Sequence, residues 1–84
     1  MKLSKGLIKA LNHIASSEKG IGDPYIEESS VSYIFVTYES ILMTLDDVAW
    51  IIQVFKDCLQ DDQKVVNFNF TDDQLCSLSI MISK

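Results

Sequence analysis

The stretch "TLDDVAWIIQVFKDCLQDDQKVVNFNF", residues 44–70, contains two different periodicities. In its first part the apolar residues recur every three or four positions, which is typical of an amphipathic helix. From residue 66 onward apolar and polar residues alternate, which is typical of a strand with one buried face. This change from helix to strand decides the fold class, and the remaining segments can be placed around the pair.

We expect the helix at residues 45–60. Thr44 lies three residues before Asp47, close to the spacing of a capping box, and Asp46 and Asp47 put negative charge at the positive end of the helix dipole. The apolar half of the helix wheel consists of Leu45, Val48, Ile51, Ile52, Phe55, Cys58 and Leu59. The polar half consists of Asp46, Gln53, Asp57 and Gln60. A helix with these two faces is expected to pack against a sheet.

Residues 65–70 and 75–82 are expected to form an antiparallel hairpin. In each strand one alternating set of residues is apolar, and the other set is asparagine or serine. The apolar sets are Val66, Phe68 and Phe70 in the first strand and Cys76, Leu78, Ile80 and Ile82 in the second. The connection "TDDQ" is rich in turn-forming residues. The hairpin is therefore expected to bury one face and to present a weakly charged outer face.

Residues 3–17 predict a first helix. Its apolar stripe consists of Leu3, Leu7, Leu11 and Ile14, widened by Ile8 and Ala15. Gly20, Gly22 and the pair Asp23-Pro24 then end the helical pattern and predict a loop. This helix is the second element available to cover the sheet.

The segment "VSYIFVTYESILM", residues 31–43, is apolar on both alternating faces and predicts a central strand. The pattern leaves open whether residues 41–43 continue this strand after a bulge or turn back as a short partner. Residues 25–28 are a candidate edge strand. The expected fold is α+β, a two-layer sandwich with two helices on one face of a small, mainly antiparallel sheet. A chain of 84 residues supports one core, so we expect a single domain over residues 1–84, with the strand order left open.

The charge of the chain is acidic and unevenly distributed. Twelve acidic residues stand against seven lysines and no arginine, which gives a net charge of −5. Residues 1–20 hold four lysines and one glutamate, and residues 21–84 hold three lysines and eleven acidic residues. A chain without arginine and with this field is a poor nucleic-acid binder. The acidic field suits a basic partner protein, or the site on a protein that normally holds nucleic acid.

The sequence gives no sign of an enzyme, a metal site or a cofactor. Glycine-rich phosphate loops, C-x-x-C and H-E-x-x-H are absent, and the only histidine, His13, has no nucleophile motif near it. The three aspartate pairs, at residues 46–47, 61–62 and 72–73, fit a helix start, a helix exit and a hairpin turn better than a cation site. Cys58 and Cys76 are expected to be reduced core thiols, with one disulfide as the alternative.

Membrane association is also disfavoured. No run approaches the roughly 20 apolar residues of a membrane span, and charged and polar residues interrupt the first helix where a secretion signal would be continuous. The lysines of that helix would suit an anionic membrane surface, but its apolar stripe is needed to cover the sheet. A soluble, cytoplasmic protein is expected.

Trp50 is the residue that the helical pattern explains least, because it falls beside Asp46 and Asp57 at the acidic edge of the second helix. One interpretation is that it flanks the core and packs over a loop or the first helix. The other is that it anchors a binding surface with a polar rim. On the second interpretation the partner-binding residues are Asp46, Trp50, Gln53, Asp57, Asp61 and Asp62.

The expected function is that of a small acidic protein-binding module without catalytic activity. Its size and charge are typical of stoichiometric inhibitors such as immunity proteins and phage-encoded blockers of host defence. Two alternatives remain: a structural or adaptor subunit that self-associates, for example as a homodimer, and a small regulator that binds nucleic acid through the lysines of the first helix.

Overall fold

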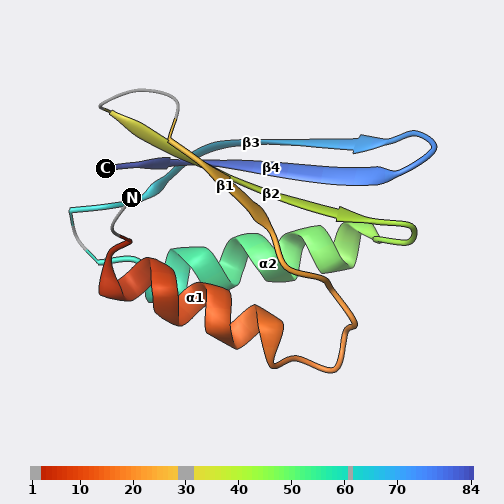
Figure 1. Cartoon of the computed structure of the whole chain (residues 1–84), viewed down its shortest axis with the longest axis horizontal. Coiled ribbons are helices and arrows are strands. Elements are labelled where there is room, and N and C mark those ends of the chain that lie inside the picture. Colours follow the sequence, from red (N-terminus) through yellow and green to blue (C-terminus); the bar gives the residue numbers. More distant parts are fainter. Residues whose placement is uncertain (1–2, 29–31, 61) are drawn as a thin grey trace.

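The computed structural model describes residues 3–28, 32–60 and 62–84, which form two helices and one four-stranded sheet. The elements are α1 (Lys5–Ala15), β1 (Tyr25–Glu27), β2 (Tyr33–Ser40), α2 (Leu45–Cys58), β3 (Val65–Asp72) and β4 (Cys76–Ser83). All neighbouring strands are antiparallel, in the order β1-β2-β4-β3. Both helices lie on one side of the sheet (Figure 1). The predicted α+β class with two layers is confirmed.

Both helices begin at a residue whose side chain accepts a backbone hydrogen bond. The Ser4 hydroxyl accepts from the Leu7 N–H at the start of α1. At the start of α2, the Thr44 hydroxyl accepts from the Asp47 N–H, and the Asp47 carboxylate accepts from the Thr44 N–H. Each bond satisfies a backbone donor that has no partner within the helix. The predicted capping box is confirmed.

The buried stripe of α1 is narrower than expected. It consists of Gly6, Leu7, Ala10 and Ile14, with Leu3 and Leu11 half-buried beside it. Ile8 and Ala15, which were predicted to widen the stripe, are exposed. The prediction for Ile8 and Ala15 was wrong because α2 contacts the other side of the stripe, where its backbone lies against Gly6. The helix therefore buries Gly6 and Ala10 in place of Ile8 and Ala15.

The buried face of α2 consists of Val48, Ile51, Val54 and Phe55. Leu45 was predicted to belong to this face, and that prediction was wrong. As the first residue of α2, Leu45 lies one turn before the first buried position, Val48. The wheel assigns a direction to each residue but does not show where along its length the helix meets a partner.

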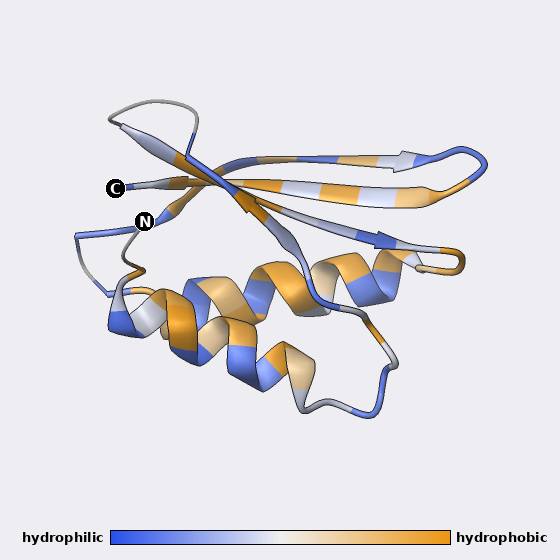
Figure 2. Ribbon diagram, viewed as in Figure 1, coloured by the Kyte–Doolittle hydropathy of each residue, from blue (hydrophilic) through white to orange (hydrophobic). Residues whose placement is uncertain are grey.

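The central strands of the sheet, β2 and β4, supply most of its contribution to the core. Their register pairs buried residues with buried residues, for example Ile34 with Ile82 and Tyr38 with Leu78. The intervening residues lie on the open face, where Phe35 and Met81 are half-buried opposite each other. Along β4, buried and half-buried residues therefore alternate, and serine occupies every half-buried position except that of Met81. The ribbon of β4 accordingly alternates in hydropathy along most of its length (Figure 2).

The two uncertain segments of the sequence now have a definite structure. Residues 25–27 form β1, an edge strand that pairs with β2, as expected. Residues 41–43 are neither a continuation of β2 nor a separate strand, and they lead from β2 directly into α2. Within that connection Met43 is buried in the core.

β3 departs from clean alternation at its beginning. Val65 pairs with Ile82 and Asn67 pairs with Met81, so Val66 is an extra residue that forms a bulge. Val65 is consequently half-buried and Val66 is exposed, the reverse of the predicted arrangement for Val66.

Beyond the bulge, Phe68 and Phe70 pair with the buried Ile80 and Leu78 and so lie on the predicted face of the sheet. The prediction that Phe68 is buried was wrong, because β3 is the edge strand and Phe68 is 49% exposed there.

One buried polar group stands out in the core. The Tyr38 side chain is buried against Phe55, and its hydroxyl has no hydrogen-bond partner among the described residues. Burial raises the pKa of this hydroxyl well above its ordinary value, with a smaller contribution from the Asp23 carboxylate. The hydroxyl therefore stays protonated, and burying it without a hydrogen-bond partner among these residues costs the fold free energy.

Neither helix in the described part of the chain is long and apolar enough to cross a membrane.

Candidate protein-binding surface

Three of the predicted binding residues lie on the exposed side of α2. Asp46, Gln53 and Asp57 are all exposed. The Gln53 Nε2 donates a hydrogen bond of 2.8 Å to the Asp57 Oδ1, one helical turn further along. Asp62 is exposed in the connection to β3, and Asp61 lies outside the described residues. The helix therefore presents a polar, acidic side along its length.

Trp50 occupies the space between the two helices. Its ring centroid lies 6.0 Å from that of His13 on α1, and the Lys19 Nζ lies 5.1 Å from the same ring. The side chain is half-buried and packs against the hydrophobic core. Trp50 lies at the edge of the apolar face of α2, and α1 lies alongside that edge. Packing over the first helix therefore describes its position, while a contact with a partner remains a prediction for its exposed part.

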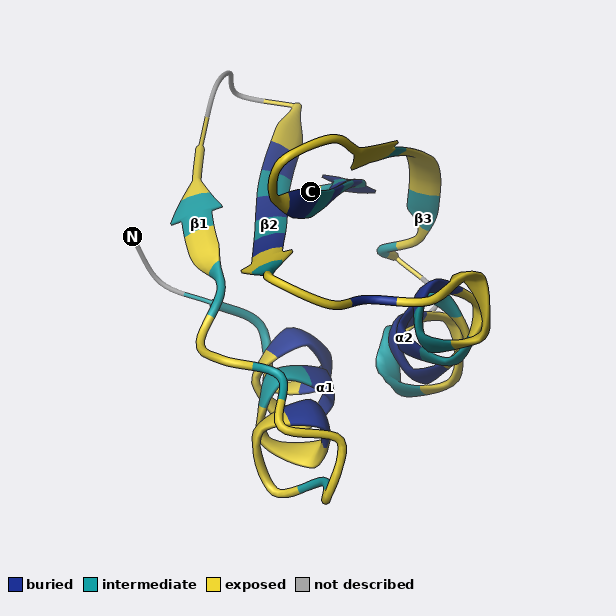
Figure 3. Cartoon of the chain, turned by 90° about the vertical axis from the view of Figure 1, so that its right-hand side faces the viewer, coloured by how far each residue is buried: buried dark blue, intermediate teal, exposed yellow. Residues whose placement is uncertain are grey.

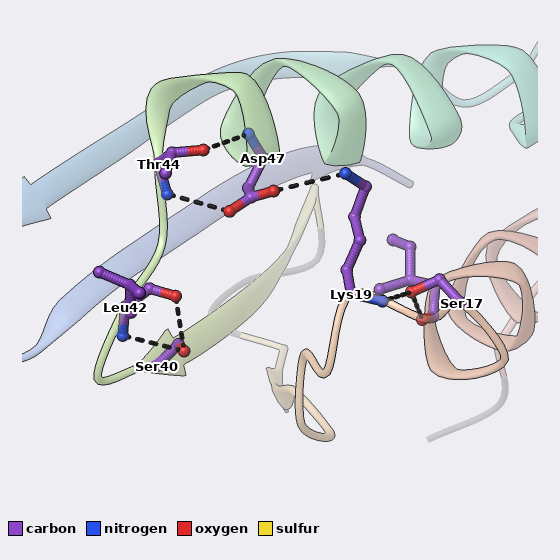
Figure 4. A network of polar contacts seen from close by, with 7 residues as sticks. Ser17, Lys19, Ser40, Leu42, Thr44 and Asp47 are labelled. Carbon is purple, nitrogen blue, oxygen red and sulfur yellow. Dashed lines mark hydrogen bonds and ion pairs between the residues drawn. The ribbon is translucent and has the colours of Figure 1, made fainter.

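Lys19 links the loop after α1 to the start of α2 (Figure 4). Its Nζ lies 3.5 Å from the Asp47 Oδ1. The pKa of Asp47 is lowered, first by the hydrogen bond from the Thr44 backbone N–H, and further by the Thr44 hydroxyl and Lys19. Asp47 therefore serves the helix start and the contact between helices. Of the two acidic residues in this turn, Asp46 is the one that faces solvent.

A group of exposed aliphatic side chains lies at the same end of the molecule. Ile41 is 87% exposed, Leu42 is 81% exposed and Leu45 is 73% exposed. Leu75, in the turn between β3 and β4, is also exposed, and the pairing of Ser40 with Cys76 brings that turn beside the β2–α2 connection. The two connections lie together at one end of the sheet (Figures 1 and 3). We call these four residues the aliphatic tip.

The backbone of the aliphatic tip is held in place on both sides. The Ser40 hydroxyl accepts a hydrogen bond from the Leu42 N–H at 3.3 Å and donates one to the Leu42 carbonyl at 3.1 Å (Figure 4). Met43 is buried, and Thr44 caps α2. The connection thus turns one side chain into the core and leaves its neighbours in solvent in a defined conformation.

Acidic residues surround the aliphatic tip, and most lysines lie elsewhere. Exposed carboxylates at this end belong to Glu39, Asp46, Asp72 and Asp73. The opposite end, where α1 and β3 begin and α2 and β4 finish, carries Lys5, Lys56, Lys64 and Lys84. At the tip end the described lysine is Lys19, which contacts Asp47. The tip is therefore an apolar centre with an acidic rim.

One signal in the sequence marks this surface. Residues 41–45 hold four aliphatic or methionine side chains in five positions, between a strand and a helix cap. Residues 41–43 were interpreted as strand and Leu45 as part of the buried helix face, because apolar residues are usually buried. A connection this short cannot bury all of them, since only one side of it faces the core.

The remaining histidine, cysteine and acidic side chains of the described ranges were also candidates for a metal site or a disulfide. No cluster of three or more histidine, cysteine or acidic side chains is placed to hold a metal ion there. Cys58 and Cys76 are free thiols, and the Cys76 Sγ lies 3.4 Å from the Asp72 Oδ1. His13 contacts Trp50 through its ring.

The chain matches no protein family, and no curated protein or solved structure is significantly similar to it. Its function must be inferred from its own surface.

Proposed function

We propose that this protein is a non-enzymatic protein-binding module that inhibits a basic partner by occupying its surface. The observation that carries the proposal is the aliphatic tip, whose Ile41, Leu42 and Leu45 are 73–87% exposed on a backbone fixed by hydrogen bonds. Contiguous exposed apolar side chains on a small protein favour a contact surface, because their exposure to water is unfavourable and their burial against a partner lowers the free energy.

The aliphatic tip continues into the acidic side of α2. Leu45 and Asp46 are neighbours in the first turn of the helix, and Gln53 and Asp57 follow two and three turns later. A partner with an apolar pocket bordered by lysine or arginine would fit both parts at once. Buried apolar anchors within a polar rim supply most of the binding energy in protein interfaces, and rim charges speed association.

The tip also changes the expected role of Trp50. The Trp50 ring already contacts His13 and Lys19, so less of its surface is available to a partner than the sequence pattern implied. In this proposal Ile41 and Leu42 are the anchors, and the side of α2 formed by Asp46, Gln53 and Asp57 is the rim.

Inhibition by occupancy suits a molecule of this size and charge. It needs a rigid contact surface and no reactive groups, and an acidic surface competes with nucleic acid for a basic site. The alternative of nucleic-acid binding through the lysines of α1 has less support, because the chain has no arginine and its net charge of −5 repels nucleic acid.

Affinity capture from the native host, followed by calorimetry with the purified partner, tests the proposal. Replacing Ile41 or Leu42 by Ser should weaken the complex by about 2 kcal/mol, or about 30-fold in Kd, because each removes an apolar anchor. The same variants should melt like the wild type, since both side chains are exposed. Ile8→Ser, an exposed aliphatic position on α1, is the matched control and should bind normally.

The acidic rim is tested in the same assay. Charge reversal at Asp46 and Asp57 should mainly lower the association rate and weaken its dependence on salt, because rim charges act on encounter. Binding that is unaffected by Ile41→Ser, Leu42→Ser and the charge reversals would place the interface elsewhere and refute the proposal.

A further inference from the structure

β3 is a long strand with a free edge. The strand order β1-β2-β4-β3 leaves β3 paired on one side only, over eight residues. The other edge strand, β1, has three residues. A free edge presents backbone donors and acceptors that another strand can use, and native proteins commonly protect long edges with lysine, proline, bulges or short length.

Backbone hydrogen bonds fix which groups of β3 face outward. The Ser83 N–H donates to the Lys64 carbonyl, so alternate residues of β4 back from Ser83, including Met81 and Ser79, direct their backbone groups toward β3. The N–H and C=O groups of their partners, Asn67 and Asn69, therefore point toward β4. Phe68, Phe70 and Asp72 direct their N–H and C=O groups to the free edge. In agreement, the Phe68 N–H donates a hydrogen bond of 2.8 Å to the Asn67 Oδ1, a bond that a second strand pairing at this position would replace.

The middle of this edge lacks the usual protection. Within Val65–Asp72 there is neither lysine nor proline, and the bulge lies at the first residues. Phe68 is 49% exposed although its cross-strand partner, Ile80, is fully buried on the helix side of the sheet. A phenylalanine that points to the helix side but remains half in water marks a place where the core stops short of its edge.

We propose that two copies of the chain pair through their β3 strands, antiparallel about a twofold axis at Asn69, into one continuous eight-stranded sheet. In this register Phe68 of each copy lies opposite Phe70 of the other, so four phenylalanines meet on the helix side. Asn69 faces Asn69, and Asn67 faces Thr71, on the open side. The register uses residues 67–71, which lie between the bulge and the hairpin turn.

The charges at the ends of β3 favour this orientation. Lys64 precedes the strand, and Asp72 and Asp73 lie at its other end. Antiparallel pairing places the basic end of one strand beside the acidic end of the other, whereas parallel pairing would set like charges together. The net charge of −5 on each chain opposes association overall. The dimer should therefore become tighter as salt screens the repulsion between the two chains.

The dimer is independent of the proposed inhibitor function. The antiparallel arrangement leaves the aliphatic tips at opposite ends of the joined sheet. Loss of the dimer should therefore leave the affinity of each tip for a partner unchanged, and loss of the tip should leave the dimer intact.

Site-specific crosslinking tests the register. In a Cys58→Ser background, Asn69→Cys should form an intermolecular disulfide under oxidised glutathione, because directly opposite Cα atoms in a non-hydrogen-bonded pair lie about 4.5 Å apart. Thr71→Cys is the matched control. In the proposed register its two copies are four residues apart along the strands, roughly 13 Å, and should not crosslink. Equal crosslinking of the two variants, or crosslinking of Thr71→Cys alone, would overturn the register.

Light scattering tests the dimer itself. The wild type should show the mass of two chains at high concentration, and Phe68→Lys should show the mass of one, because a lysine in the middle of an edge disfavours strand pairing. Ile8→Lys also replaces a half-exposed apolar residue by lysine, but on α1, and this variant should remain dimeric. A wild type that is monomeric at its highest soluble concentration, or equal masses for the two folded lysine variants, would overturn the proposal.

Discussion

The two ends of the helix pair are built in different ways. At one end the backbones of α1 and α2 are in contact at Gly6. A Cβ atom on Gly6 would lie 2.6 Å from the Cys58 carbonyl oxygen and 3.2 Å from the Leu59 Cα. At the other end the helices are joined through long side chains, with Trp50 between His13 and Lys19. We call these the closed end and the open end.

The difference separates stability from binding. Backbone atoms at the closed end cannot move without shifting a whole helix. A single added methyl group there would therefore disturb the packing of the entire core. Side chains at the open end can rearrange, and the aliphatic tip lies next to them. We therefore expect substitutions at the closed end to unfold the protein and substitutions at the open end to act more on its surface.

The largest effect is expected for Gly6→Val. The new side chain would overlap the last turn of α2, and overpacking against backbone should cost about 3 kcal/mol or more, a large part of the stability of a small domain. Urea denaturation followed by circular dichroism measures the loss. Gly22→Val is the control, because a Cβ atom at Gly22 has no atom within 4 Å and its backbone is not left-handed. Equal stability of the two variants would show that the helices do not touch at Gly6.

A smaller effect is expected for Trp50→Ala. Trp50 is half-buried between the helices, so its removal should cost the isolated protein about 2 kcal/mol, less than the 3–5 kcal/mol of a fully buried tryptophan. Denaturation in urea measures this cost, and His13→Ala, which removes only the neighbouring ring, should cost much less. A Trp50→Ala variant as stable as the wild type would show that Trp50 adds nothing to the contact between α1 and α2.

Local features of the fold could be predicted from the sequence. The capping box at Thr44 and Asp47 depends on residues three positions apart, and the β3–β4 hairpin depends on alternation between neighbours. Physical rules for such features act within a few residues, so the sequence contains them directly. The edge strand β1 and the central position of β2 were predicted for the same reason.

The features that were missed depend on contacts between distant segments. Leu45 satisfies the helix pattern but lies beyond the part of α2 that the core covers, and Gly6 matters only because α2 crosses it. Among the candidate binding residues, the exposed positions Asp46, Gln53 and Asp57 were placed correctly on one side of α2. The position of Trp50 could not be decided, because periodicity shows that a residue lies at an edge but not which element lies alongside it.

The smallest effect concerns the open end and depends on pH. Asp47 accepts hydrogen bonds from Thr44 and contacts Lys19, and its pKa is lowered in the folded protein, first by the Thr44 backbone N–H. A carboxyl group with a lowered folded pKa stabilises the fold above its unfolded pKa of about 3.9, and this contribution is lost as pH falls through the lower folded value. Asp47→Asn removes the charge and should cost about 1 kcal/mol or less at pH 7, where the capping bond is charged.

The difference between wild type and Asp47→Asn should then shrink as pH falls below about 4, because protonation of Asp47 removes the same charge from the wild type. Urea denaturation of both proteins between neutral and acidic pH measures it. Asp46→Asn is the matched control: Asp46 occupies the same helical turn but faces solvent and makes none of the Thr44 hydrogen bonds. Its substitution should change stability less than that of Asp47 at every pH. If the two variants gave the same profile, the stabilisation would come from negative charge near the helix start, and the specific contacts of Asp47 with Thr44 and Lys19 would contribute nothing to the open end.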